Sequence, residues 1–380
     1  MREYLLVLLV AGAATYLLAG LCRSIAVRTG VLALPRDRDV HTEPIPYFGG
    51  VAMFGGLGVA LTLAIQLPFL GRYAVVGHDA MAVVLAGFVI TLVGVIDDRY
   101  DLSPFIKLAG QGLAAGIAVL QGVRIFWIPL PNSIFILDDA TSILLTVGFI
   151  ALCVNAVNFV DGLDGLAAGV IAIGSGVFFA YTYYLAYEQE LVRATTASLI
   201  TVATCGVCIG FLAHNFHPAK MFMGDSGAML LGLLMAMSAI SFTGQIDTGA
   251  LVPERGGMLP ALLPVLLPFA VMVLPFVDLL AAWVRRTRKG QFWFVADKDH
   301  IHHRLLARGH SHRGAVFLMY GWTAVVSVGL VVIAFSDSPV AVVGVIVAVV
   351  VVLAATVRPL RPLKATETDE VLLAGTDTDD

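Results

Sequence analysis

The stretch AMAVVLAGFVITLVGVIDD, residues 80–98, decides the fold class of this chain. Residues 80–96 are uncharged and almost entirely apolar, and two adjacent aspartates follow. A helix needs roughly 20 apolar residues to cross the hydrocarbon core of a bilayer. An acidic side chain at membrane depth costs about 2.5–3.5 kcal/mol on insertion scales, so Asp97 and Asp98 suggest a task with a cation or a proton. The alternative is a solvated helix end, neutralised by Arg99.

The composition of the whole chain agrees with this stretch. Of the 380 residues, 59% are hydrophobic and 13% are charged, whereas a soluble domain carries roughly 25% charged residues. A soluble core cannot bury so much apolar surface, because surface-to-volume scaling limits it. The net charge of −4 argues neither for nor against nucleic acid, and we expect no nucleic-acid partner.

Eleven apolar segments are candidate membrane spans, and patterns typical of alternating strands are absent. The segments are residues 4–22, 48–70, 80–97, 106–123, 141–158, 164–186, 195–213, 226–243, 259–284, 316–335 and 338–357. The sequence therefore predicts an all-α polytopic membrane protein with about 11 transmembrane helices. We expect one transmembrane domain over residues 1–363 and an acidic, disordered cytoplasmic tail over residues 364–380. The segment 124–137, which contains two prolines, is predicted to form a short outer hairpin.

Lysine and arginine indicate the orientation, because cytoplasmic loops carry an excess of both. The eleven-span topology puts 18 of them on one side and 5 on the other. We therefore expect the N-terminus outside and the C-terminus in the cytoplasm. The unusual polar clusters all fall on the cytoplasmic side; they are residues 36–50, 97–107, 155–164, 214–225 and 297–303.

Two of these clusters are rich in oxygen ligands. In NAVNFVDGLDG, residues 155–165, two asparagines precede two Asp-Gly turns, and capping of the next helix by Asp164 explains one aspartate at most. In HNFHPAKMFMGDSGAM, residues 214–229, Asp225 opens an apolar helix whose free amides could hold phosphate. Carboxylate and amide oxygens are the ligands that Mg²⁺ prefers.

The cluster ADKDHIHHRLLARGHSHR, residues 296–313, combines histidines with many basic residues. A zinc site and a plain basic loop are alternatives, but no cysteine lies nearby, and binding of phosphate or sugar fits better. Phosphoryl transfer depends on positioning and on neutralising charge, which a metal and basic donors provide. The clusters together therefore suggest a phosphotransferase that acts at the membrane surface.

Five motifs in order resemble the polyprenyl-phosphate N-acetylhexosamine-1-phosphate transferases, between His41 and Arg304. They are PYFGG (46–50), the Asp97-Asp98 pair, NAVNFVDGLDG (155–165), FMGDSGA (222–228) and HIHHR (300–304). The resemblance implies transfer from a UDP-N-acetyl sugar to polyprenyl phosphate with release of UMP, using Mg²⁺, with Mn²⁺ as a substitute. It also implies a bacterial plasma-membrane enzyme that acts on the cytoplasmic face in envelope polysaccharide synthesis, and it leaves a homodimer open.

The HIHHR motif resembles the branch that uses UDP-N-acetylglucosamine. The branch that transfers phospho-N-acetylmuramoyl-pentapeptide typically has three adjacent histidines, and Ile301 interrupts that run here. That branch stays an alternative. So do a transporter, which would place charges near the midplane, and a CDP-alcohol phosphotransferase, which would need an arginine where Gly169 stands.

The resemblance also implies roles for single residues. Asp225 would bind Mg²⁺ with help from Asn158, Asp97 would be the base that deprotonates the lipid phosphate, and Asp98 would tune the site. Asp161 and Asp164 would position the nucleotide, which completes the catalytic set. The predicted substrate-binding residues are His41, Lys107, Asn155, Asn158, His300, His302, His303 and Arg304, with Lys107 on the lipid phosphate and the 300–304 group on the diphosphate and amino sugar.

Asp278 has two interpretations at this stage. It lies in the proline-rich ninth segment, near the expected inner membrane edge. It could pair with Arg285 or Arg286, or it could belong to the site.

Overall fold

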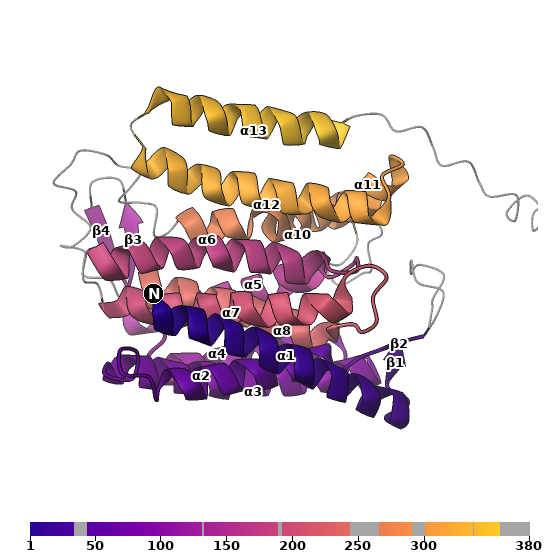
Figure 1. Ribbon diagram of the computed structural model, residues 1–380, viewed down its shortest axis with the longest axis horizontal. Helices are drawn as coiled ribbons and strands as arrows, with labels where there is room; N and C mark the ends of the chain where they lie inside the picture. The colour runs from indigo at the N-terminus through magenta and orange to yellow at the C-terminus, as the bar shows by residue number, and fades with distance from the viewer. Residues whose placement is uncertain are drawn as a thin grey trace, which may run out of the picture.

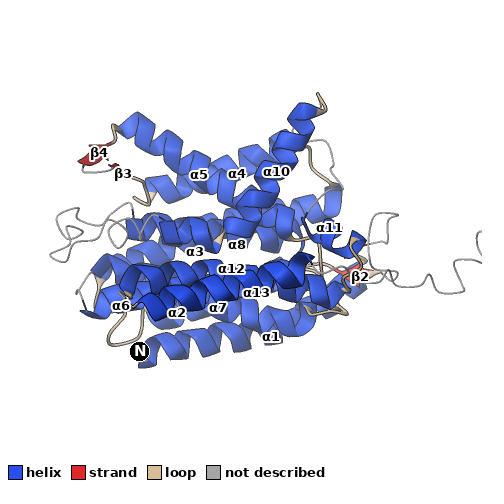
Figure 2. Ribbon diagram, turned by 90° about the horizontal axis from the view of Figure 1, so that it is seen from above, coloured by secondary structure: helices blue, strands red, loops and turns tan. Residues whose placement is uncertain are grey.

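The computed structural model describes residues 1–33, 44–130, 133–188, 192–243, 266–290, 301–336 and 338–357. Most of these residues are helical, and the long helices run side by side as one bundle (Figures 1 and 2). The helices are α1 (Arg2–Thr29), α2 (Gly49–Ala64), α3 (Ala74–Tyr100), α4 (Pro104–Leu120), α5 (Asp139–Val160), α6 (Leu166–Glu188), α7 (Val192–Asn215), α8 (Gly224–Thr243), α10 (Val273–Arg288), α11 (Ile301–Ala307), α12 (His312–Phe335) and α13 (Pro339–Val357).

Two short antiparallel strand pairs complete the described structure. Strand β1 (Leu32–Ala33) pairs with β2 (Ile45–Pro46), and β3 (Trp127–Leu130) pairs with β4 (Ser133–Ile136). The second pair confirms the hairpin predicted over residues 124–137. The predicted tail, residues 364–380, lies outside the described residues.

Eight of the described helices are long and apolar enough to cross a membrane: α1, α3, α5, α6, α7, α8, α12 and α13. Helices α2 and α4 are apolar but shorter. Every predicted span coincides with a helix, although the ninth is described only from residue 266. The second span was predicted to residue 70, but α2 ends at Ala64, before a polar glutamine and Pro68. The prediction of an all-α polytopic membrane protein is confirmed at this level.

Helix α8 lies at the centre of the bundle. It packs against α2, α3, α5 and α7, and nearly all of its span is buried, whereas α13 buries none of its residues within the described structure. A helix that is apolar on every side suits such a core position. The burial of α8 therefore holds its first turn, which contains Asp225, against several neighbours at once.

Two glycines allow the first turn of α8 to approach its neighbours. A Cβ atom on Gly94 of α3 would lie 2.2 Å from the Cα atom of Ser226, and one on Gly50 of α2 would lie 2.2 Å from the backbone nitrogen of Gly227. The start of α2 is also hydrogen-bonded to this region, since Gly50 donates its N–H to the carbonyl of Met223 at 2.9 Å. The PYFGG and FMGDSGA motifs are therefore structural partners.

We expect Gly94→Ala to lower the melting temperature of the purified protein by several degrees. The added methyl group would collide with backbone atoms, and overpacking costs roughly 1–3 kcal/mol. Gly112→Ala in α4 is the matched control, because a Cβ there meets nothing within 4 Å. Thermal unfolding in detergent measures both variants, and equal melting temperatures for the two would contradict the importance of this close approach.

Candidate active site

The predicted polar motifs meet at one end of the bundle. The carboxyl ends of α3 and α5, the first turn of α4 and the first turn of α8 come together there. Strand β2 joins them, because the Pro46 carbonyl accepts the N–H of Phe222 at 2.9 Å. Figure 1 shows β1, β2 and α11 at this end of the molecule. The antiparallel course of the helices thus gathers residues that are far apart in the sequence.

The side chain of Asp225 is hydrogen-bonded to side chains of two other helices, α4 and α5. Its Oδ2 atom accepts a hydrogen bond from Lys107 Nζ at 3.0 Å, and its Oδ1 atom accepts one from Asn158 Nδ2 at 3.0 Å. Lys107 Nζ also lies 2.5 Å from Asp97 Oδ2. One lysine therefore bridges the predicted base and the predicted metal ligand.

The two adjacent aspartates of α3 have different surroundings, because neighbouring residues of a helix point in different directions. Asp97 is buried, and its Oδ1 atom accepts the N–H of Leu102 at 2.8 Å. Asp98 faces the first turn of α8, where it accepts the N–H of Asp225 at 2.7 Å and the hydroxyl of Ser226 at 2.9 Å. The amides expected to be free for phosphate are thus bound by Asp98, which corrects that expectation.

Asp161 lies in the turn that follows α5 and completes a group of four neighbouring carboxylates. Burial, together with the negative charges of Asp225, Asp98 and Asp164, raises its pKa to about 8. The ammonium of Lys107 contacts the carboxylates of Asp97 and Asp225, while Asp98 and Asp161 add two more carboxylates near Asp225. The group carries an excess of oxygen ligands and negative charge, which favours a bound cation.

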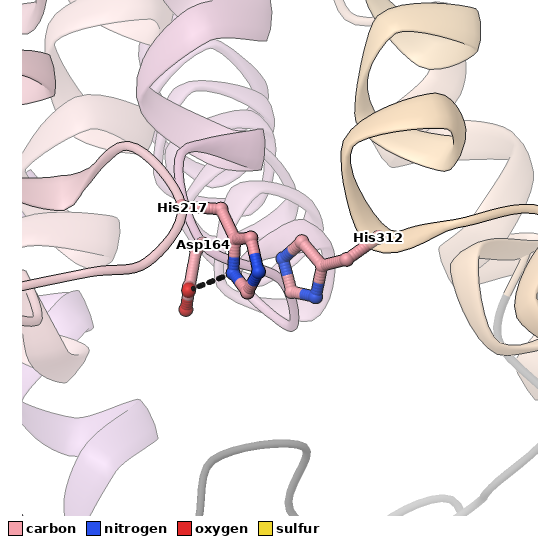
Figure 3. Close-up of side chains that lie close together, drawn as sticks. All are labelled: Asp164, His217 and His312. Carbon is pink, nitrogen blue, oxygen red and sulfur yellow. Dashed lines mark hydrogen bonds and ion pairs between the residues drawn. The ribbon is translucent and has the colours of Figure 1, made fainter. Parts of the chain in front are cut away.

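Asp164 lies in a second cluster, together with two histidines that the sequence did not single out (Figure 3). Its Oδ2 atom lies 2.7 Å from His217 Nδ1 and accepts the N–H of Ala219 at 3.1 Å. The rings of His217 and His312 are stacked, with centroids 4.1 Å apart and an angle of 17° between their planes. Both histidines stand in the polar motifs of the sequence, but no spacing rule connects them.

These three side chains offer metal-ligand atoms within 4.8 Å of one another. However, the rings of His217 and His312 are nearly parallel, so their nitrogen lone pairs lie in two parallel planes and do not converge on one metal position. The first turn of α12, where His312 lies, and the neighbouring Arg313 are positive and would oppose a cation. The arrangement suits a link between the 161–165 turn, the 215–221 segment and α12, and Asn215 adds a second link by accepting the N–H of Gly165 at 3.0 Å.

A cavity of about 450 Å³ opens beside Lys107. Gln111 and Asn155 form part of its polar wall, and Asn155 Nδ2 donates to Gln111 Oε1 at 2.7 Å. Leu108 of α4 lines the cavity and is exposed, and Phe105 and Ile106 of the same helix are exposed as well. The cavity therefore joins a polar interior to an apolar surface, and Gln111 is a lining residue that no sequence motif indicated.

The histidine motif is described only in part. His41 and His300 lie outside the described residues, as do the side chains of His302 and His303, while Arg304 is exposed on α11. The side chain of Asp278 in α10 is buried, and its Oδ1 atom accepts the N–H of Ile301 at 3.0 Å. Asp278 thus contacts the first residue of α11.

Comparison with known proteins gives consistent matches over most of the chain. The model for glycosyl transferase family 4 matches residues 80–243. The decaprenyl-phosphate N-acetylglucosaminephosphotransferase of Mycobacterium tuberculosis strain H37Rv is 45% identical over 333 residues, covering 87% of this chain and 82% of the relative. The probable undecaprenyl-phosphate N-acetylglucosaminyl 1-phosphate transferase of Bacillus subtilis strain 168 is 34% identical over 300 residues, covering 78% and 76%.

A more distant relative agrees. The undecaprenyl-phosphate alpha-N-acetylglucosaminyl 1-phosphate transferase of Escherichia coli K12 is 26% identical over 306 residues, covering 78% of this chain and 75% of the relative. The matched region of the family model contains the Asp97-Asp98 pair, the asparagine and aspartate motif after it, and Asp225. The chain therefore belongs to glycosyl transferase family 4, within the group of polyprenyl-phosphate N-acetylglucosamine-1-phosphate transferases.

Proposed function

We propose that this chain transfers N-acetylglucosamine-1-phosphate from UDP-N-acetylglucosamine to a polyprenyl phosphate, as the names of its relatives state for them. An oxygen of the lipid phosphate bonds to the phosphorus that carries the sugar. The bond from that phosphorus to the bridging oxygen of the diphosphate breaks, and UMP leaves. The products are UMP and N-acetylglucosaminyl-diphosphate-polyprenol.

The observation that carries this proposal is the bridge from Asp97 through Lys107 to Asp225, at the mouth of a cavity beside an apolar helix surface. A lipid phosphate in the cavity could take Lys107 as its cation while its chain stays in the bilayer. Lys107 would then exchange a carboxylate oxygen for a phosphate oxygen, which frees Asp97 to accept the proton of the lipid phosphate. Asp98 would support the site by holding the first turn of α8.

The residues around Asp225 fit a magnesium ion. Asp225 offers carboxylate oxygens, and the amide of Asn158 lies 3.0 Å from it and could turn to present its oxygen. Magnesium, or manganese in its place, would neutralise charge on the diphosphate of the donor. Asp161 and Asp164, at the edge of the site, would position the nucleotide, and the 300–304 motif would contact the diphosphate and sugar.

The proposal includes a topology. The chain would cross the plasma membrane of a bacterium about 11 times as one domain, residues 1–363, with the N-terminus outside and the catalytic end in the cytoplasm. The distribution of 18 and 5 basic residues supports this orientation. The gathering of the polar motifs at one end of the bundle supports a single catalytic face.

Purified protein in detergent should release UMP from UDP-N-acetylglucosamine when polyprenyl phosphate and Mg²⁺ are present. Chelation of the metal should abolish the release, and added Mg²⁺ should restore it, because the carboxylate group would otherwise repel the diphosphate. UDP-N-acetylmuramoyl-pentapeptide in place of the donor tests the alternative branch. UMP release from that donor alone would disprove the proposed sugar.

Asp225→Ala and Asp97→Asn should each reduce kcat/KM by at least about 100-fold, since each removes charge at the point where phosphoryl transfer is stabilised. Size-exclusion profiles and melting temperatures should stay close to those of the unmodified protein. Asp139→Asn is the matched control, because this exposed aspartate pairs with Arg124 next to the β3–β4 hairpin. Near-normal turnover by either site variant would refute the role given to that residue.

A tag fused after residue 380 should be reached by protease only when the cytoplasmic face of membrane vesicles is exposed. A single engineered cysteine in the 124–137 hairpin should be labelled from the opposite side by a membrane-impermeant reagent. If both reagents act from the same side, the number of spans between the hairpin and the C-terminus is even, which would contradict the proposed topology.

A further inference from the structure

Asp278 is an acidic residue in the interior of the molecule. Its side chain is fully buried, and it lies within α10, which packs against α5 and α12. A buried carboxylate in a membrane protein is costly unless it is paired or hydrogen-bonded, so such residues usually have a task. One hydrogen bond of Asp278 goes to a backbone amide outside its own helix, the N–H of Ile301.

Ile301 is held at two points. It is the first residue of α11, so its N–H is one of the amides that a helix cannot satisfy internally, and Asp278 accepts it at 3.0 Å. The Ile301 side chain packs against an apolar cluster that includes Leu163 and Leu305. The residue that interrupts the histidine run is therefore the anchor of the helix.

This anchor connects two motifs of the proposed site. The same apolar cluster contains Val160 and Leu163, which flank Asp161 in the turn after α5. Helix α11 carries His302, His303 and Arg304 directly after Ile301. A second contact from α10 reaches the same region, because the guanidinium of Arg286 lies over the ring of Phe159 at 5.4 Å.

We propose that Asp278 is a positioning residue for the sugar nucleotide: through the amide of Ile301 it sets the start of α11 and thereby places residues 301–304 relative to the turn around Asp161. The inference rests on the proposed function for the identity of the donor. The anchor itself does not depend on that identity, so the two can be tested separately.

Hydrogen–deuterium exchange of the full-length protein tests the anchor without any substrate. Asp278→Ala should accelerate exchange in the peptide that covers residues 301–307, because the first amide loses its acceptor and the helix end opens more often. Asp79→Ala in α3 is the matched control. Asp79 is also buried in a membrane helix, but it lies near the start of α3, whereas the site lies at the end of that helix. Unchanged exchange in Asp278→Ala would overturn the proposal.

Steady-state UMP release tests the consequence. Asp278→Ala should raise KM for UDP-N-acetylglucosamine by about tenfold or more and leave KM for polyprenyl phosphate within about twofold, because only the donor side loses its position. Asp278→Asn should recover most of the donor KM, since its side-chain oxygen still accepts the amide. A fall in kcat with both KM values unchanged, or equal defects in Asn and Ala variants, would refute the positioning role.

Should Asp278→Ala fail to assemble, Asp278→Asn and Ile301→Ala carry the test. Ile301→Ala should raise the donor KM in the same way, because it removes the apolar half of the anchor, and an unchanged donor KM would count against the proposal. If exchange responds as expected while the unmodified protein releases no UMP, the anchor stands and the proposed function fails.

Discussion

The hydrogen bonds that Asp98 accepts from the first turn of α8 are the interaction on which the site depends. They attach the end of α3 to the start of the central helix, and they do so with a carboxylate at the positive end of that helix. Gly94 allows the approach, because any larger residue would collide with Ser226. With α3 and α8 held in this way, Asp97 and Asp225 lie on the two sides of Lys107.

The site has more carboxylates than ammonium groups, and this excess of negative charge affects what the site can bind. A buried group of carboxylates with one ammonium is unfavourable by itself, and burial together with the neighbouring carboxylates raises the pKa of Asp161. A donor diphosphate is negative as well, so it could not approach such a group without a cation. If the site binds metal and nucleotide as proposed, this arrangement would make the two binding events interdependent.

Much of the fold follows from composition and apolar run length. The predicted segments coincide with helices because a bilayer leaves the backbone few alternatives to helical hydrogen bonding. The length of an apolar run does not predict where a helix ends. Helix α1 continues to Thr29 and is capped by Gly30, and α2 ends at Ala64, before a polar glutamine and Pro68. Motif order predicted that Asp97, Lys107, Asn158 and Asp225 belong to one site, and the structure brings these four side chains together.

Sequence reasoning failed where contacts join distant residues without a motif. Gln111 of α4 is hydrogen-bonded to Asn155 of α5, and His312 of α12 stacks on His217, which lies 95 residues earlier in the chain. Asp278 is a further example, because the sequence left open whether it pairs with an arginine or belongs to the site, and no spacing rule pointed to its hydrogen bond with the amide of Ile301, 23 residues away. Tertiary geometry, and not spacing, selects such partners.

The cavity beside α4 has a consequence for how the protein meets its lipid. Under the proposed function, the lipid phosphate would reach Lys107 by lateral diffusion without leaving the bilayer, because the exposed apolar Leu108 also lines the cavity. The search is then two-dimensional, and the quantity that governs encounter is the number of acceptor molecules per area of membrane. Swelling or thinning the bilayer would change that encounter by shifting the depth at which head groups lie, even if the protein itself stayed the same.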